Sequence, residues 1–493
     1  MFWIRMVSVF YYLLIIAFQA VFCFSSSVLC YNAIDNLSCA IGQFDRAQAP
    51  MGGVCSWCNG IPSHLSPVSR ILAVRELRVS QGYGDPLYKR FYDFTIVRFY
   101  GALNFSFAMR TRQDVVAQTI GSYLFPSQCL PDVEGQDINA HAKTVIQAQL
   151  SRFGVFFNPF AGMTECDIYG ILEMDFGGVS LDTQYTAKLR HAFGEIVWNS
   201  GAFLFGQYYH PLFLKECFPR TIDFNMGAPY EPQGIMPQIR LSQRFGPVEF
   251  AIAVSSESYI QSYGPLVGIV SVPSISFIQD AMVPDCSFLA KFIIDSSFYG
   301  GAFDYKRLVP RLASDNNYKV NEYLDSFIWE AFAHNVFSWG ELNLKFIYSQ
   351  NGSDQLLISG FAVRTQEPIT NKQTYVNTAA LSGWLDVFWL FYNQEMSLGL
   401  FVGGAKNLGA KNSLFINPTT NQPVVFAVNS IAQNVSYSAR ISPRFVFARD
   451  AFRFGFECSW NGISYGCLDD FAQVVDPVPV GSFEYTVALD YVF

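Results

Sequence analysis

The chain has 493 residues, of which 15% are charged and 17% are aromatic, and its formal net charge is −8. Soluble proteins carry about 25% charged residues, so the composition argues against a soluble domain with a polar outer surface. A protein built of membrane-spanning helices is also disfavoured, because a run of about 18 or more apolar residues occurs only once. The net charge gives no independent indication of which solutes the protein binds.

The single long apolar run lies at the start of the chain, from Met6 to Phe24. One charge, Arg5, precedes this run, and three small residues follow it at 25–27. Such an order is typical of a secretory signal peptide. We therefore expect residues 1–25 to direct export, and an uncleaved membrane anchor is the alternative.

Residues 26–93 contain clusters of Gly and Pro and one helix-like run at 66–81. We expect an N-terminal periplasmic extension here, and a plug or a trimer-stabilising arm is the alternative. The motif CSWC places Cys55 and Cys58 at the spacing found in thioredoxins, but the βαβ unit that a redox role needs is absent. These two cysteines are therefore candidates for a structural disulfide.

Alternating apolar and polar residues begin at 94–110. Polar side chains such as Arg98 and Asn104 fall on one face, and apolar ones such as Phe99 and Phe105 fall on the other. A period of two is typical of a β-strand with unlike faces. The same pattern predicts fifteen further strands, at 141–157, 164–177, 185–198, 202–209, 235–244, 247–256, 284–295, 297–308, 319–333, 336–349, 374–391, 395–405, 434–449, 451–461 and 481–493.

Short and long connections alternate between these predicted strands, with one brief exception at 178–184. The short ones include a turn at 334–335, and the long ones include a loop at 462–480. Outer-membrane barrels have strands of about ten residues, with short turns at one end and longer loops at the other. Only helices and closed barrels satisfy their backbone polar groups in lipid. We therefore predict an all-β fold, in which residues 94–493 form a transmembrane antiparallel β-barrel of about sixteen strands.

The last predicted strand alternates up to a terminal aromatic residue, in the sequence SFEYTVALDYVF at 482–493. This ending resembles the C-terminal signal of bacterial outer-membrane barrels. The resemblance implies that Phe493 and Tyr491 mark the protein for membrane assembly. It further implies recognition by the barrel-assembly machinery, contact with outer-membrane lipid and a location in the outer membrane.

Two segments resemble the DcaP-like porins of Gram-negative outer membranes: CDIYGILEMDFGG at 166–178 and AKLRHAFGEIVWNSGAFLFGQYYHPLF at 187–213. The segment IVRFYGALNFSF at 96–107 is similar to the first strand of that family. The resemblance implies a trimeric channel of sixteen strands. Its implied activity is passive uptake of small anions, including dicarboxylates.

The cysteine content departs from this pattern, because ten cysteines remain outside the predicted signal peptide. In this respect the chain resembles the cysteine-rich major outer-membrane porins of chlamydiae and legionellae, which are the second candidate family. An even count in an exported protein suggests disulfides. Candidate pairs are Cys458 with Cys467, around the last outer loop, and Cys217 with Cys286, in or beside neighbouring outer loops. A cysteine-linked structural or adhesive surface barrel without a channel is therefore the alternative function.

Alternation directs a set of cations toward the lumen. The candidate pore-lining and anion-binding residues are Arg98, Lys188, Arg190, Arg240, Arg244, Arg440, Arg444 and Arg453, and Lys291 and Lys345 share their face. Carboxylates are expected on the same inner face at Glu173, Asp175, Glu341, Glu457, Glu484 and Asp490. Guanidinium groups bind carboxylates and phosphates in bidentate geometry, so these rows favour small anions as solutes. The alternative is a polar wall in which the charges neutralise one another.

The segment at 211–234 is apolar for an outer loop and follows the fifth predicted strand. We expect it to fold into the barrel and narrow the channel. Its candidate constriction residues are Lys215, Arg220, Asp223 and Glu231. Packing over the mouth of the barrel, or against a neighbouring subunit, is the alternative.

No sequence motif for catalysis or for nucleotide binding is present, whether G-x-S-x-G, H-E-x-x-H or a P-loop. The five histidines are scattered, and we expect structural roles for them, with His191 facing outward toward lipid or a subunit interface. We therefore predict a protein that is not an enzyme. We also expect no metal, no cofactor and no nucleic-acid partner.

Overall fold

The structure is a computed structural model that describes residues 96–115, 124–158, 166–178, 185–223, 225–258, 260–265, 271–391, 395–427 and 434–493. The predicted signal peptide at 1–25 and the predicted extension at 26–93 lie outside these residues. The candidate disulfide between Cys55 and Cys58 lies outside them as well.

The wall of the barrel has sixteen strand positions in the described part of the chain. The first eight are β1 (Ile96–Arg110), β2 (Lys143–Gln147) together with β3 (Arg152–Asn158), β4 (Asp167–Asp175), β5 (Lys188–Trp198), β6 (Gly201–Tyr209), β7 (Ile235–Phe245), β8 (Val248–Ser255) and β11 (Asp285–Ile294). The second eight are β12 (Ser297–Leu308), β13 (Leu324–Phe337), β14 (Gly340–Gln350), β16 (Gln373–Phe391), β17 (Met396–Ala410), β21 (Val435–Arg449), β22 (Phe452–Leu468) and β23 (Val474–Val492).

Each of these strands pairs antiparallel with its neighbours, and β1 pairs with β23 from Ala102 opposite Val492 to Arg110 opposite Glu484. The ring is therefore closed, which confirms the predicted fold class. Because the strands alternate in direction, the short turns lie at the end where β1 begins, and the long connections lie at the other end.

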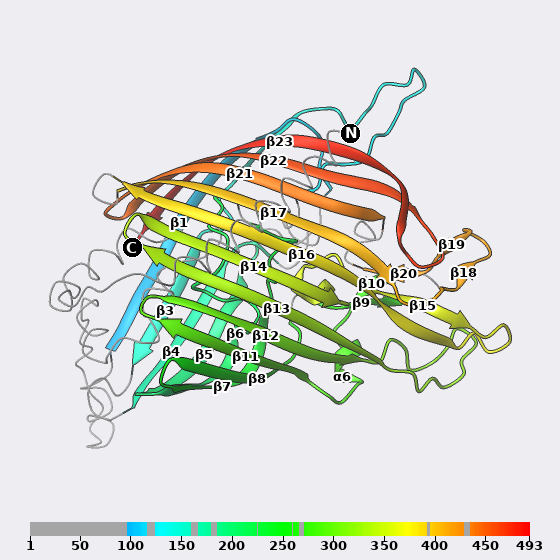
Figure 1. The fold of residues 1–493 in the computed structure, drawn as a ribbon, viewed down its shortest axis with the longest axis horizontal. Coiled ribbons are helices and arrows are strands. Elements are labelled where there is room, and N and C mark those ends of the chain that lie inside the picture. The colour runs from blue at the N-terminus through cyan, green and yellow to red at the C-terminus, as the bar shows by residue number, and fades with distance from the viewer. Residues whose placement is uncertain are drawn as a thin grey trace. The chain divides into compact units, whose positions relative to one another are not determined.

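Short elements occupy the long connections, and several of them gather at one end of the barrel in Figure 1. They are β9 (Tyr263–Pro265), β10 (Ser271–Pro273), α6 (Ser276–Gln279), the 3₁₀ helix η2 (Ser353–Gln355), β15 (Phe361–Gln366), β18 (Ile416–Asn417), β19 (Gln422–Pro423) and β20 (Val425–Phe426). Among the described residues, no helix is long and apolar enough to cross a membrane.

Two predicted connections are wrong. The predicted turn at 334–335 lies inside β13, where His334 pairs with Asn343 of β14, and the true turn is at 338–339. The predicted loop at 462–480 is mostly strand, because β22 continues to Leu468 and β23 already begins at Val474. The ladder between the two strands continues along this stretch to Leu468 opposite Val474, with a register shift between Tyr465 and Cys467.

The two faces of the strands differ as the alternation predicts. On β1, Phe99 and Leu103 are 59% and 57% exposed on the outer face, whereas Asn104 and Ser106 are 8% and 6% exposed on the inner face. The outer face is thus a band of apolar side chains, and the inner face is polar. This is the arrangement that a barrel needs in order to meet lipid outside and polar groups inside.

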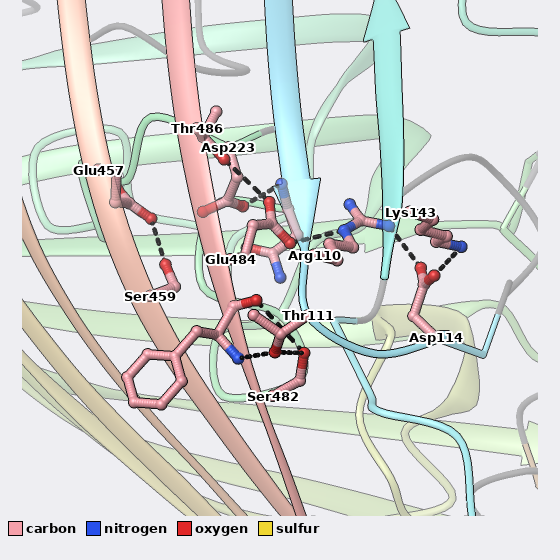
Figure 2. Close-up of polar contacts among 12 residues, drawn as sticks. Arg110, Thr111, Asp114, Lys143, Asp223, Glu457, Ser459, Ser482, Glu484 and Thr486 are labelled. Atoms are coloured by element: carbon pink, nitrogen blue, oxygen red, sulfur yellow. Dashed lines mark hydrogen bonds and ion pairs between the residues drawn. The ribbon is translucent and has the colours of Figure 1, made fainter. Parts of the chain in front are cut away.

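Polar contacts close the seam between the first and last strands (Figure 2). The Arg110 side chain of β1 donates a hydrogen bond of 2.7 Å from Nε to Glu484 of β23. On its other side, Arg110 forms an ion pair with Asp114, which also binds Lys143 of β2. One carboxylate therefore joins the end of β1 to the start of β2 across the long first loop.

The C-terminal residue is part of the wall. The Phe493 amide donates to the Gly101 carbonyl at 3.1 Å, and the Gly101 amide donates back to Phe493 at 2.9 Å. The aromatic ring covers Gly101 so closely that a Cβ there would lie 2.6 Å from the ring Cζ. Glycine at 101 thus leaves room for the terminal ring.

Deletion of Phe493 should lower the yield of folded barrel. It removes two backbone hydrogen bonds, each worth about 0.5–1.5 kcal/mol net, together with the ring that covers Gly101. We expect less of the heat-modifiable folded form on gels, with Phe493→Tyr as the control that keeps the ring and the backbone. A deletion variant that assembles like the wild-type protein would show that the terminal residue is dispensable.

Candidate functional site

The loop at 210–234, called here the first inserted loop, crosses the lumen. It leaves β6, the fifth strand position, and its Leu212 carbonyl accepts a hydrogen bond of 2.8 Å from Lys345 on β14. Its Ile222 amide donates at 2.7 Å to Glu457 on β22. These partners occupy the eleventh and fifteenth of sixteen positions, so the loop reaches the opposite wall. Its role as a constriction stays a prediction.

Arg440 of β21 anchors the first inserted loop to the wall. Its guanidinium forms ion pairs with Asp223 of the loop and with Glu457 of β22, the latter at 2.5 Å. It also donates to the Asn225 side chain at 2.6 Å. Since Arg440 is only 1% exposed, this buried charge is compensated by carboxylates from both the wall and the loop.

A second anchor lies beside it. Arg444 forms a bidentate pair with Asp386 of β16, with N–O distances of 2.7 and 2.9 Å. The backbone amide of Arg220 in the loop donates to the same carboxylate at 3.2 Å. The Arg220 side chain pairs with Glu341 of β14.

The third anchor is built around Lys345. Its ammonium lies 2.8 Å from Glu231 of the loop and 3.5 Å from Glu330 of β13. The Trp384 indole donates a hydrogen bond of 2.7 Å to the second oxygen of Glu231. Buried ion pairs of this kind cost much desolvation energy and persist only when hydrogen bonds complete them.

These anchors correct part of the prediction from sequence. Arg440 and Arg444 do lie on the inner face, but carboxylates surround them beneath the loop, so they do not form an open anion-binding row. Arg220, Asp223 and Glu231 of the loop fix it to the wall. The neutralising pairs that the sequence left as an alternative are therefore found along this wall.

A second group of cations lies on the strands from β22 through β1 to β5, together with Lys215 of the first inserted loop, and we call it the basic stripe. Its members are Arg152, Lys188, Arg190, Lys215 and Arg453. Arg190 pairs with Glu173 at 2.8 Å, and Lys188 lies 3.4 Å from Asp175. Lys215, from the first inserted loop, places its ammonium 5.0 Å from the ring centroid of Tyr208 and so faces this wall. Arg152, Arg190 and Lys215 are all near enough to act electrostatically on the Tyr209 hydroxyl.

Arg152 is the member of the stripe that sequence reasoning missed. It is 5% exposed, and its Nε has no hydrogen-bond partner within the described residues. Together with Arg453 it lies close enough to Asp490 to interact with that carboxylate. The signal was present in the sequence, because Arg152, Gly154, Phe156 and Asn158 are two residues apart and so share one strand face. It was missed because the predicted strand at 141–157 ran through the break that separates β2 from β3.

The stripe carries five cations and, nearby, the three carboxylates Glu173, Asp175 and Asp490. Five minus three leaves a formal charge of +2. In contrast, the three anchors combine Arg220, Lys345, Arg440 and Arg444 with Asp223, Glu231, Glu330, Glu341, Asp386 and Glu457. Four minus six gives −2. The basic stripe therefore has more cations than nearby carboxylates, whereas the anchors have fewer.

Three other predicted lining residues also lie inward, and one of them, Arg240, lies over the same Tyr208 ring as Lys215 of the stripe. Arg98 is half-buried near the start of β1. Arg240 donates to Gln238 at 3.0 Å and stacks over Tyr208 at 5.9 Å from its centroid. Arg244 lies near the short-turn end and donates to the Gly246 carbonyl at 2.9 Å.

His191 faces inward, contrary to the prediction. A bulge in β5 pairs Glu173 with His191 and Met174 with Leu189, so that Arg190 is the extra residue. A bulge interrupts the alternation of faces, and as a result Arg190 and His191 are both buried. The imidazole packs against Tyr209, with ring centroids 4.6 Å apart.

The candidate disulfides among the described cysteines are also wrong. Cys458 and Cys467 lie on the same strand, β22, and nine residues of strand span about 30 Å, whereas bridged Cα atoms lie about 4.4–6.8 Å apart. Cys217 is buried inside, where its thiol contacts the Ala333 carbonyl at 3.5 Å, but Cys286 is exposed on the outer face of β11. The six described cysteines are all free.

No protein-family model and no curated protein matches the chain. Among solved structures, the outer-membrane channel DcaP of Acinetobacter baumannii aligns with a TM-score of 0.59 and 13% identity, covering 81% of this chain and 97% of that one. Two further structures align with a TM-score of 0.46 and 10% identity, each covering 81% of this chain. They are OmpT of Vibrio cholerae, of which 98% is covered, and the anion-selective porin of Comamonas acidovorans, of which 100% is covered. The likeness to DcaP confirms the expected resemblance at the level of the fold.

Proposed function

We propose that the protein is a porin of the bacterial outer membrane, through which small hydrophilic solutes diffuse passively. The observation that carries this proposal is a closed barrel with an apolar outer face, a charged inner face and a loop that crosses the lumen. Passive diffusion needs no catalytic residue and no cofactor. The fold shared with the DcaP channel supports the same conclusion, and assembly by the barrel-assembly machinery as a homotrimer belongs to the proposal.

The finer proposal is a preference for small anions such as dicarboxylates. It rests on the basic stripe, where a buried guanidinium at Arg152 lacks a hydrogen-bond partner for its Nε within the described residues. A guanidinium offers a planar pair of donors that matches a carboxylate. Lys215 belongs to the first inserted loop, whereas the other members of the stripe lie on the barrel wall. A solute that passes between the loop and this wall therefore meets cations on both sides.

A structural or adhesive barrel without a channel is the second candidate. It is favoured by a cluster of buried apolar side chains inside the barrel, which includes Leu212, Leu214 and Tyr230 of the first inserted loop and Phe401 and Trp384 of the wall. Such a core fills part of the lumen. The two candidates differ in whether a water-filled path remains beside that core.

Single-channel recording in planar lipid bilayers separates the two candidates. We expect the purified barrel to produce stepwise increases in current, and trimers to produce them in groups of three. A refolded, heat-modifiable barrel that never conducts would rule out the porin and favour the structural role.

A further inference from the structure

A second segment, Asn351 to Gly360, also folds into the barrel. Every residue of this second inserted segment is buried, although it connects β14 to β15 at the end with long connections. The Ser359 hydroxyl lies 2.7 Å from the Ser349 hydroxyl on the inner face of β14. The Gly360 amide donates at 2.9 Å to the hydroxyl of Thr378 on β16. The base of the segment is thus fixed to the eleventh and twelfth strand positions.

The tip of the segment reaches across the lumen. The carbonyl of Gln355 accepts a hydrogen bond of 3.0 Å from the Gln233 amide in the first inserted loop. The Gln355 side chain lies 3.9 Å from the Met236 sulfur on β7, the sixth strand position. Leu356 and Leu357 join the same buried cluster as Leu212 of the first inserted loop.

The second segment lies nearer than the first loop to the end with long connections. On β14, which runs toward that end, Lys345 holds the first loop and Ser349 contacts the second segment. Four residues of strand correspond to about 13 Å. The two insertions therefore lie at successive depths along the lumen, and they touch each other through Gln233 and Gln355.

One lysine fastens the second segment to the wall. Lys306 of β12 forms an ion pair with Asp354 and donates at 2.9 Å to the Asn351 carbonyl. It also donates at 3.0 Å to the hydroxyl of Ser262, which in turn binds Glu257 at 2.6 Å. Burial raises the pKa of Glu257 to about 7, although Lys306 opposes that shift.

The surroundings of Lys306 are strongly acidic. Asp285 and Asp304 are buried on the neighbouring inner face, at 0% and 2% exposure. Neither oxygen of Asp285 has a hydrogen-bond partner in the described part of the chain. With Asp354 and Glu257, three carboxylates thus act on this one lysine, and Asp304 lies beside Asp285. Removing that lysine leaves Asp354 buried without its cation and takes away the hydrogen bond to the Asn351 carbonyl, so the segment loses its attachment to the wall.

We propose that the second inserted segment is an outer constriction of the channel, held in the lumen by Lys306. This inference rests on the proposed porin function and adds a selecting element to it. A solute meets the second segment before it meets the first loop and the basic stripe. The size limit of the channel is therefore set by two insertions in series.

The test compares Lys306→Met with the wild-type barrel by single-channel conductance and by the swelling of liposomes in sugars of increasing size. We expect at least about a twofold rise in conductance, and entry of larger sugars, because both follow the width of the pore. The matched control is Arg307→Met. Arg307 is the next residue on β12, but its side chain is partly exposed and pairs with Asp325 at 2.7 Å.

A second variant covers the case in which Lys306→Met fails to fold. It replaces residues 353–358 by two glycines, which the geometry allows because the Gly352 amide already lies 3.0 Å from the Ser359 hydroxyl. The same rise in conductance and in sugar size is expected. Wild-type values in both variants would overturn the outer constriction. Absence of conductance in the wild type and in all variants would instead overturn the porin function itself.

Discussion

Replacing Arg440 by Ser should destabilise the barrel strongly and loosen the first inserted loop. The substitution leaves Asp223 and Glu457 buried beside each other without their shared guanidinium, and breaking a buried pair in this way costs about 3–5 kcal/mol. We expect a clear fall in the urea midpoint of unfolding. We also expect higher and noisier single-channel conductance, because Asp223 and Asn225 lose their anchor on the wall.

The control for this prediction is Arg449→Ser, on the same strand. The Arg449 side chain is 68% exposed and lies 3.9 Å from Glu395, and exposed pairs contribute about 0–1 kcal/mol. Its removal should leave the unfolding midpoint nearly unchanged. Adding Asp223→Asn to Arg440→Ser should restore part of the lost stability, because it removes one of the two repelling charges. An Arg440→Ser barrel as stable as the wild type would show that this anchor is not required.

The sequence predicted the wall well because a barrel wall depends on local information. Each strand shows its two faces through a period of two, so the inward direction of Arg98 or Asp490 follows from the residues beside it. Errors arose where the local rule was interrupted. The bulge at Arg190 turned His191 inward, and the ladder between β22 and β23 extends to Leu468, beyond the predicted strand end at 461.

The site was less predictable because its contacts are distant in the chain. Alternation placed Arg440 on the inner face, but its partner Asp223 lies 217 residues away, and no local pattern connects the two. The same holds for Lys306 and Asp354, 48 residues apart. Period-two reasoning therefore distinguishes inside from outside, whereas the partner of an inner charge depends on how the loops fold.

The distribution of these partners decides where selectivity arises. On the wall from β13 to β22, each described cation of the three anchors is matched by carboxylates, and the first inserted loop covers them. In the basic stripe, by contrast, cations exceed the nearby carboxylates by two. A passing anion is therefore attracted to the basic stripe, and the anchoring arginines act on it only by holding the first inserted loop in place.

The last prediction concerns ion selectivity. We expect the channel to prefer anions and the double variant Arg152→Ser with Lys188→Ser to lose most of that preference. At ~4 Å and an effective dielectric near 20, one charge attracts an anion by about 4 kcal/mol before desolvation is subtracted. Salt screens the attraction over roughly 8 Å at physiological strength. If ~1.4 kcal/mol of this attraction remains, the occupancy of the channel by anions rises tenfold. Such a difference shifts the reversal potential measurably.

The measurement is the reversal potential in a KCl gradient across a planar bilayer. Arg152→Lys keeps the charge and should keep the selectivity, whereas Arg244→Ser removes an inward charge near the short-turn end and should have little effect. Glu173, Asp175 and Asp490 do not cancel the stripe, because its five cations outnumber these three carboxylates. A wild-type channel that prefers cations, or a double variant with an unchanged reversal potential, would mean that the basic stripe only balances its own carboxylates.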